Sequence, residues 1–137
     1  MEKQKHIVHL DDHSLITIAI ENLLNKFFPD CSCHGFSNTE KAWRFIKNLL
    51  LSDEKIGLIV TDFVYSGPNG YEFAKNIREL EMKKNFKSIP IILLTMIDET
   101  NPMVKRGLKD NIFNNCLSLA SPEKVLIQTF RDSLKHK

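Results

Sequence analysis

Short apolar runs alternate with helix-length amphipathic segments five times along this 137-residue chain. The two clearest runs, IGLIVT at 56–61 and IPIILLT at 89–95, are continuous and rich in β-branched residues, as is typical of strands covered on both faces. Weaker runs at 7–10, 31–36 and 112–119 complete a set of five predicted strands. This alternation predicts an α/β fold with a five-stranded, doubly wound parallel sheet and helices on both faces.

The segments between these runs carry helix signals. Residues 14–28 place apolar side chains three and four positions apart, which is the spacing of one helix face. The SNTE sequence at 37–40 predicts a capping box at the start of the second helix. A third helix is expected near Gly70, and the last is expected to open with Ser121 as N-cap and Pro122 as its first residue.

The composition fits a single domain over residues 1–137. A hydrophobic fraction of 42% and a net charge of +2 demand neither disorder nor a polybasic surface, so no nucleic-acid partner is expected. The longest uninterrupted apolar run, IILL, is far too short to span a bilayer, and the N-terminal segment lacks the apolar stretch of a signal peptide. Three cysteines without a disulfide framework suit a reducing compartment. The sequence therefore predicts a cytoplasmic protein without a membrane partner.

Three carboxylates and one hydroxyl directly follow or end the clearest predicted strands. Asp11 and Asp12 come after the first strand, Asp62 follows the third, and Thr95 ends the fourth. In open α/β sheets, ligands bind outside the carboxyl ends of the strands, so these groups should meet at one edge. Clustered carboxylates repel one another unless a cation is present, and hard oxygen ligands suit Mg²⁺.

Each of these residues also has an ordinary structural explanation. A single aspartate after a strand is usually a turn residue or a helix N-cap, and Asp12 or His13 could precede the helix that starts at Ser14. Thr95 alone would be unremarkable in a β-rich segment. The coincidence of all the positions at strand ends favours the metal site.

In these motifs the chain resembles the receiver domain of bacterial two-component response regulators. The likeness spans nearly the whole sequence and rests on VHLDDHSL, LIVTDFVYSGPNGYEFAKNIRE, SIPIILLT and LASPEKVLIQTF. An acidic pair combined with an aspartate followed eight residues later by glycine is more specific than any single motif. The resemblance implies the flavodoxin-like receiver fold.

The family's roles carry over to matching positions of this chain. Asp62 is similar to the phosphoacceptor, which takes a phosphoryl group from a sensor histidine kinase or phosphotransfer protein. Asp12 is similar to the direct Mg²⁺ ligand, Asp11 to its partner through water, and the backbone carbonyl of Val64 to a third protein ligand. Thr95 is similar to the hydroxyl that turns toward the phosphoryl oxygen.

The chain also departs from the family pattern. The family's lysine at the end of the fifth strand, usually followed by proline, corresponds to Ser118, and no lysine lies between Lys109 and Lys124. Asn115 occupies the aromatic switch position, and bulky Met96 follows the switch hydroxyl. The metal pocket is therefore expected to be intact and the signalling half to be altered.

Two functions compete. One is a phosphoacceptor module, not a turnover enzyme, that signals to a protein target through helix four, strand five and helix five. The other is a phosphorylation-independent pseudo-receiver that acts as an interaction domain. A Mg²⁺-dependent phosphohydrolase ranks lower because Val64, not a second acid, lies two residues after Asp62. A flavodoxin-like cofactor domain ranks lower because no phosphate-binding loop follows the first strand.

Overall fold

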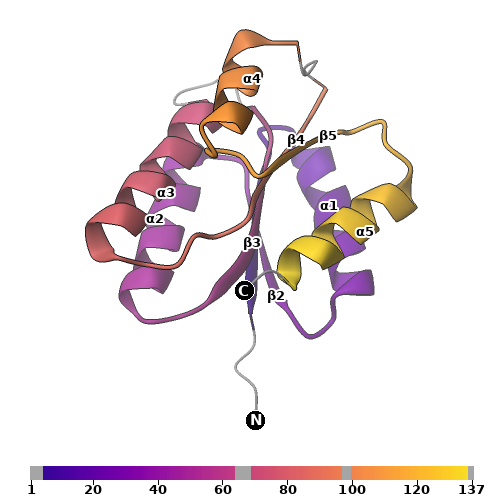
Figure 1. Ribbon diagram of the computed structural model, residues 1–137. Helices are drawn as coiled ribbons and strands as arrows, with labels where there is room; N and C mark the ends of the chain where they lie inside the picture. The colour runs from indigo at the N-terminus through magenta and orange to yellow at the C-terminus, as the bar shows by residue number, and fades with distance from the viewer. Residues whose placement is uncertain (1–4, 64–68, 97–99, 136–137) are drawn as a thin grey trace.

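The computed structural model describes residues 5–63, 69–96 and 100–135. All five strands are parallel and lie in one sheet in the order β2-β1-β3-β4-β5 (Figure 1). In chain order the elements are β1 (His6–Leu10), α1 (Ser14–Phe27), β2 (Ser32–Phe36), α2 (Thr39–Leu51), β3 (Ile56–Thr61), α3 (Gly70–Lys84), β4 (Ile91–Thr95), α4 (Pro102–Lys109), β5 (Asn115–Ser118) and α5 (Glu123–Leu134). The predicted fold class is confirmed.

Two apolar layers cover the sheet because successive side chains of a strand point to opposite faces. On one face, β-strand residues pack with the buried sides of α2, α3 and α4; on the other, they pack with α1 and α5 (Figure 1). In β4, for example, Ile91 and Leu93 face the first layer, whereas Ile92 and Leu94 face the second. None of the helices in the described ranges is long and apolar enough to cross a membrane.

Asparagine is the N-cap residue of three helices, α2, α3 and α4. Asn38 accepts a hydrogen bond from the Lys41 backbone N–H, so the predicted capping box with Ser37 at the N-cap is wrong by one position. The cause is that Asn38 has the extended backbone that an N-cap requires and a carbonyl oxygen that reaches the same orphan amides. Asn69 and Asn101 cap α3 and α4 in the same way.

The last helix also begins one residue later than predicted. Pro122 occupies the N-cap of α5 and Glu123 is the first helical residue, so the assignment of Ser121 as N-cap is wrong. Because proline has no N–H to leave unpaired, it is tolerated at this boundary.

A nearly buried ion pair fastens α3 to the loops that enter β4 and β5. The side chains of Arg78 and Glu81 are only 12% and 6% exposed, and their closest charged atoms lie 3.0 Å apart. Glu81 accepts a 2.7 Å hydrogen bond from the Ile89 backbone N–H, while Arg78 donates to the Ile89 carbonyl and to Asn114 Oδ1, each at 2.8 Å. The entry points of both strands are therefore held by one side-chain network.

Candidate functional site

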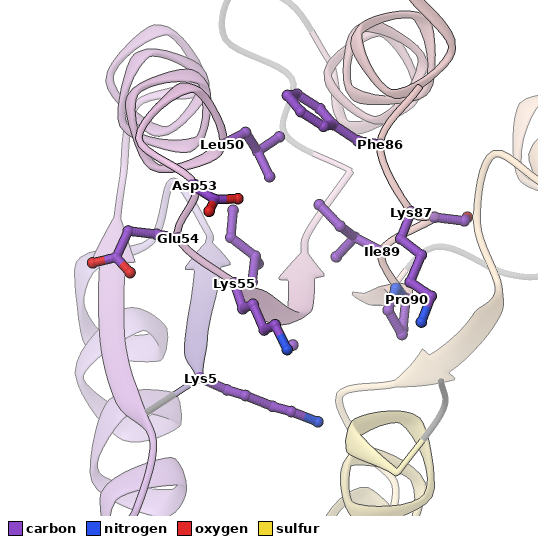
Figure 2. Close-up of a pocket in the computed structure, with 12 residues that line it drawn as sticks. Lys5, Leu50, Asp53, Glu54, Lys55, Phe86, Lys87, Ile89 and Pro90 are labelled. Carbon is purple, nitrogen blue, oxygen red and sulfur yellow. The ribbon is translucent and has the colours of Figure 1, made fainter. Parts of the chain in front are cut away.

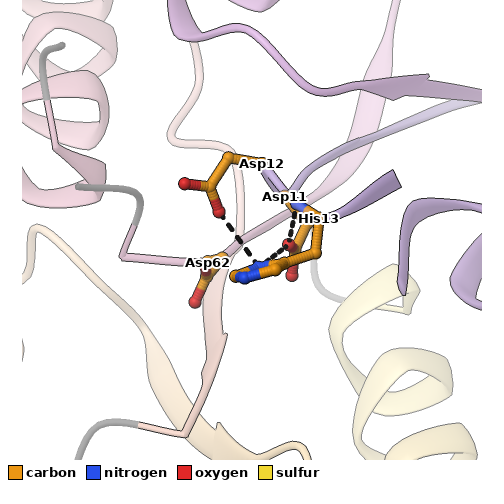
Figure 3. A group of neighbouring side chains, drawn as sticks. All are labelled: Asp11, Asp12, His13 and Asp62. Carbon is orange, nitrogen blue, oxygen red and sulfur yellow. Dashed lines mark hydrogen bonds and ion pairs between the residues drawn. The ribbon is translucent and has the colours of Figure 1, made fainter. Parts of the chain in front are cut away.

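Four side chains meet at the carboxyl ends of the neighbouring interior strands β1 and β3. Asp11 and Asp12 directly follow β1, and Asp62 directly follows β3. The Asp62 backbone N–H donates to the Leu10 carbonyl at 2.8 Å, which places the two strand ends side by side. One ligand atom each from Asp11, Asp12, His13 and Asp62 lies within 4.8 Å of all the others (Figure 3). The three acids lie together as expected, and the structure adds His13.

Asp11 is the buried member of this group, with 1% of its surface exposed. Its Oδ1 accepts a 2.8 Å hydrogen bond from the His13 backbone N–H, while Oδ2 has no hydrogen-bond partner within the described part of the chain. Burial raises the pKa of Asp11, and the nearby charge of Asp62 raises it further, although the hydrogen bond from His13 opposes both effects. A buried carboxylate oxygen without a partner is costly, so this site favours a cation.

The imidazole of His13 lies over the acidic pair. Its Nδ1 is 3.2 Å from Asp11 Oδ1 and 3.2 Å from Asp12 Oδ1 (Figure 3). The hydrogen bond to Asp11 raises the pKa of His13, and the negative charges of Asp12 and Asp11 add to the effect. The ring is 69% exposed, so it can leave or rejoin the site without disturbing the core.

A divalent cation fits this arrangement. Three carboxylates converge, and both Asp11 Oδ2 and Asp12 Oδ1 are buried atoms without a hydrogen bond among the described residues. Oxygen-rich sites with few protein ligands are typical of Mg²⁺, which retains several waters. The predicted contribution of the Val64 carbonyl lies outside the described residues.

Thr95 and Ser118 continue the same edge of the sheet. Thr95 ends β4 and is 2% exposed, and it is paired in register with Ser118, the exposed last residue of β5. The Leu119 backbone N–H donates to the Thr95 carbonyl at 3.2 Å. The Ser118 hydroxyl accepts a 3.0 Å hydrogen bond from the Ala120 N–H, in the loop that follows β5. Ser118 thus occupies the strand end at which the resemblance expects a lysine.

Glycine is required where α3 begins. The Gly70 N–H donates to the Phe63 carbonyl, which brings the helix start against the segment that follows β3. A Cβ atom at position 70 would lie 2.5 Å from the Asp62 carbonyl oxygen and 3.0 Å from the Phe63 Cα. The absent side chain therefore lets α3 approach the backbone of Asp62.

A cavity of about 490 Å³ lies at the opposite edge of the sheet (Figure 2). Its walls come from residues 53–57 and 86–90, which lead into β3 and β4, and from Lys5 and Leu50. Its charged lining residues are of both signs, since Asp53 and Glu54 lie there together with Lys5, Lys55 and Lys87, whereas the group at the strand ends is mainly acidic. This cavity is separate from the candidate metal site.

Comparisons with known proteins agree on one family. The family model described as the response regulator receiver domain matches residues 7–128. Two-component response regulator ARR3 of Arabidopsis thaliana is 30% identical over 101 residues, which cover 67% of this chain and 40% of ARR3. The chain therefore spans less than half the length of that relative.

Solved structures show the same fold. The Vibrio cholerae chemotaxis protein CheY4 matches with a TM-score of 0.75 and 18% identity, covering 95% of this chain and 98% of that chain. The co-crystal structure of the Saccharomyces cerevisiae histidine phosphotransfer signalling protein Ypd1 and the receiver domain of Ssk1 matches with a TM-score of 0.72 and 19% identity, covering 96% and 90%. A plant, a bacterium and a yeast are represented, so these matches do not single out the bacterial source that the resemblance implies.

Proposed function

Because this chain belongs to the response regulator receiver domain family, we propose that it accepts a phosphoryl group on Asp62 and signals by protein contact. Domains of this family are signalling domains and not turnover enzymes. The observation that carries the proposal is the convergence of Asp11, Asp12 and Asp62, which includes buried carboxylate oxygens that accept no hydrogen bond from the described residues. We propose that residues 1–137 form one receiver domain.

The proposed chemistry is nucleophilic attack by a carboxylate. An Asp62 oxygen forms a bond to phosphorus while the bond from phosphorus to the donor nitrogen breaks, which leaves an aspartyl phosphate and a free imidazole on the donor. Asp11, Asp12 and Asp62, together with the Val64 carbonyl, would hold Mg²⁺, and the bound ion would offset negative charge on the phosphoryl oxygens. The Thr95 hydroxyl would donate a hydrogen bond to one of these oxygens.

The donor would be a sensor histidine kinase or a phosphotransfer protein, docked beside the acids. Two large apolar side chains of α1, Leu15 and Ile18, are 80% and 56% exposed on the helix that begins next to Asp12. We propose that these two side chains, which are three residues apart and therefore lie on one face of the helix, contact the donor. The pairing of Ypd1 with the receiver domain of Ssk1 supports a donor of this type.

The proposed surface for the downstream protein target is the face formed by α4, β5 and α5. The proposed compartment is the cytoplasm, where the donor would present its phosphohistidine.

One observation favours a second function, that of a pseudo-receiver. Ser118 ends β5, where a lysine would bind the phosphoryl group, and its hydroxyl already accepts a hydrogen bond from Ala120. A neutral hydroxyl supplies roughly half the hydrogen-bond strength of a charged donor. A domain of this kind would keep the fold and recognise its partner without phosphorylation.

Incubation with acetyl phosphate separates the two functions. With Mg²⁺ present, the intact mass of the chain should increase by one phosphoryl group, and chelation of the metal with EDTA should prevent the gain because the approaching charges are then unshielded. Phosphoramidate, a donor with a P–N bond, should give the same product. If folded, metal-bound protein gains no mass from either donor, the pseudo-receiver is the correct function.

A lysine introduced at position 118 should strengthen the response to phosphorylation. In Ser118→Lys, the ammonium group can make a charge-assisted contact that is roughly twice as strong as the neutral one it replaces. The chemical-shift changes that beryllofluoride, a phosphoryl mimic, induces at Thr95 and along α4 should therefore be larger than in the unmodified chain. Ala120→Lys is the matched control, since it adds the same charge two residues beyond the strand. Equal responses in both variants would show that the end of β5 is not the coupling point.

A further inference from the structure

We propose that His13 is a nitrogen ligand of the acidic site, which therefore binds a first-row transition-metal ion such as Co²⁺ with a selectivity over Mg²⁺ that depends on this imidazole. The inference rests on the proposed metal site and deepens it. The sequence predicts oxygen ligands alone, whereas the structure places the His13 ring within the cluster (Figure 3).

The spacing of the donor atoms supports coordination. His13 Nδ1 lies 3.2 Å from one oxygen of Asp11 and 3.2 Å from one oxygen of Asp12. Metal–ligand bonds of about 2.0–2.2 Å place neighbouring ligands of one ion about 2.8–3.6 Å apart in octahedral and tetrahedral geometry. The nitrogen therefore stands at ligand–ligand distance from both carboxylates.

The main chain fixes His13 at this position. His13 is the N-cap of α1, and its N–H donates to Asp11 Oδ1 at 2.8 Å. Its carbonyl accepts from the N–H groups of Ile16 and Thr17 at 3.1 and 3.0 Å, and the Thr17 hydroxyl donates to the Asp11 carbonyl at 3.0 Å. Since the backbone is anchored, only the exposed ring has to adjust in order to accept an ion.

The buried carboxylate supplies an independent sign of a ligand. Asp11 is 1% exposed, and its Oδ2 has no hydrogen-bond partner among the residues that the structure describes, although His13 already occupies Oδ1. The contact with His13 thus satisfies only one of the two carboxylate oxygens of Asp11. An ion that binds the acids and the imidazole together would satisfy the remaining oxygen.

The chemical identity of the ligand atoms decides which ion the site binds more tightly. Mg²⁺ prefers oxygen ligands and gains little from an imidazole, whereas Co²⁺, Ni²⁺ and Zn²⁺ bind imidazole well. The competing role for His13 is that of a counter-ion which any incoming metal displaces. The two roles predict opposite effects of removing the ring: a ligand's loss weakens Co²⁺ binding alone, whereas a counter-ion's loss strengthens the binding of both ions.

The test is calorimetric titration of the full chain with Co²⁺ and with Mg²⁺ at about pH 8, where an imidazole can lose its proton. His13→Ala should weaken Co²⁺ binding roughly tenfold or more, since even groups that merely support a ligand are worth this much. Mg²⁺ binding should stay within about twofold. Pulsed electron paramagnetic resonance with Mn²⁺ should show a ¹⁴N coupling that disappears in His13→Ala.

Two further variants make the outcomes separable. Two other histidines serve as the control: His6 Nδ1 lies 2.9 Å from His34 Nε2, away from the acidic site. The double variant His6→Ala/His34→Ala should leave Co²⁺ binding at the acidic site and the ¹⁴N coupling unchanged. Asp12→Ala should weaken binding of both ions. If His13→Ala binds Co²⁺ as well as or better than the unmodified chain, His13 is not a ligand. If Asp12→Ala has no effect on either ion, the proposed metal site itself is wrong.

Discussion

Asp62→Asn should reduce phosphoryl transfer to this chain to background. The amide cannot act as the carboxylate nucleophile, while its size and shape are nearly the same. The Asp62 backbone N–H would still donate to Leu10, and one of three clustered negative charges would be removed, so the fold should be retained or slightly stabilised. Intact mass after incubation with acetyl phosphate and Mg²⁺, together with thermal unfolding of both proteins, measures the two effects.

Asp110→Asn is the matched control. Asp110 is the C-cap residue of α4; its side chain is 51% exposed and lies 4.0 Å from the Arg106 side chain. This variant should be phosphorylated as fully as the unmodified chain. A phosphoryl group on Asp62→Asn would assign the acceptor to another residue, and peptide mapping would then identify it.

Arg78→Leu should lower the free energy of unfolding by about 3–5 kcal/mol, because removing one partner leaves a buried charge uncompensated. Among the described residues, Glu81 would keep the hydrogen bond from the Ile89 N–H and the Ile89 carbonyl would lose its Arg78 donor, while Asn114 Oδ1 would keep the 2.7 Å hydrogen bond from the Ile91 N–H. The entries of β4 and β5 would both loosen. Urea unfolding followed by circular dichroism measures the loss.

Arg44→Leu provides the comparison with an exposed ion pair. Arg44 contacts Glu40 at 2.8 Å one helical turn away, but the two side chains are 64% and 74% exposed. Exposed pairs of this spacing contribute about 0.3–0.5 kcal/mol, so this variant should be nearly as stable as the unmodified chain. The double variant Arg78→Leu/Glu81→Leu should recover part of the stability lost in Arg78→Leu, since no unpaired charge remains. If Arg44→Leu and Arg78→Leu lowered the free energy of unfolding by similar amounts, burial would not explain the contribution of the Arg78–Glu81 pair.

The sequence was sufficient to predict the layered fold because buried parallel strands carry a distinct signature. Continuous β-branched runs such as residues 56–61 are needed only where helices cover both faces, and the structure has such layers. Because ligands of open α/β sheets bind outside the carboxyl ends of the strands, the sequence also predicted that Asp11, Asp12 and Asp62 lie together, without any knowledge of side-chain orientation.

Side-chain geometry was beyond the reach of the sequence pattern. The place of His13 over the acids depends on its backbone conformation as the N-cap of α1, with φ −98° and ψ 109°, which adjacency alone does not specify. The network of Arg78 was equally hidden, since its partners Ile89 and Asn114 lie 11 and 36 residues further along the chain. Pattern reasoning follows regular spacing within an element, whereas these contacts join different elements.

The strand order gives the two halves of the site unequal local stability. The acids follow β1 and β3, which have a hydrogen-bonded strand on each side, whereas Ser118 ends β5, a four-residue strand at the edge of the described sheet that pairs with β4. Edge elements open through local fluctuations, while central strands exchange their amide hydrogens only through more extensive unfolding. Substitutions at the end of β5 should therefore change the local stability of that edge, while the position of the acids depends on the more stable interior of the sheet.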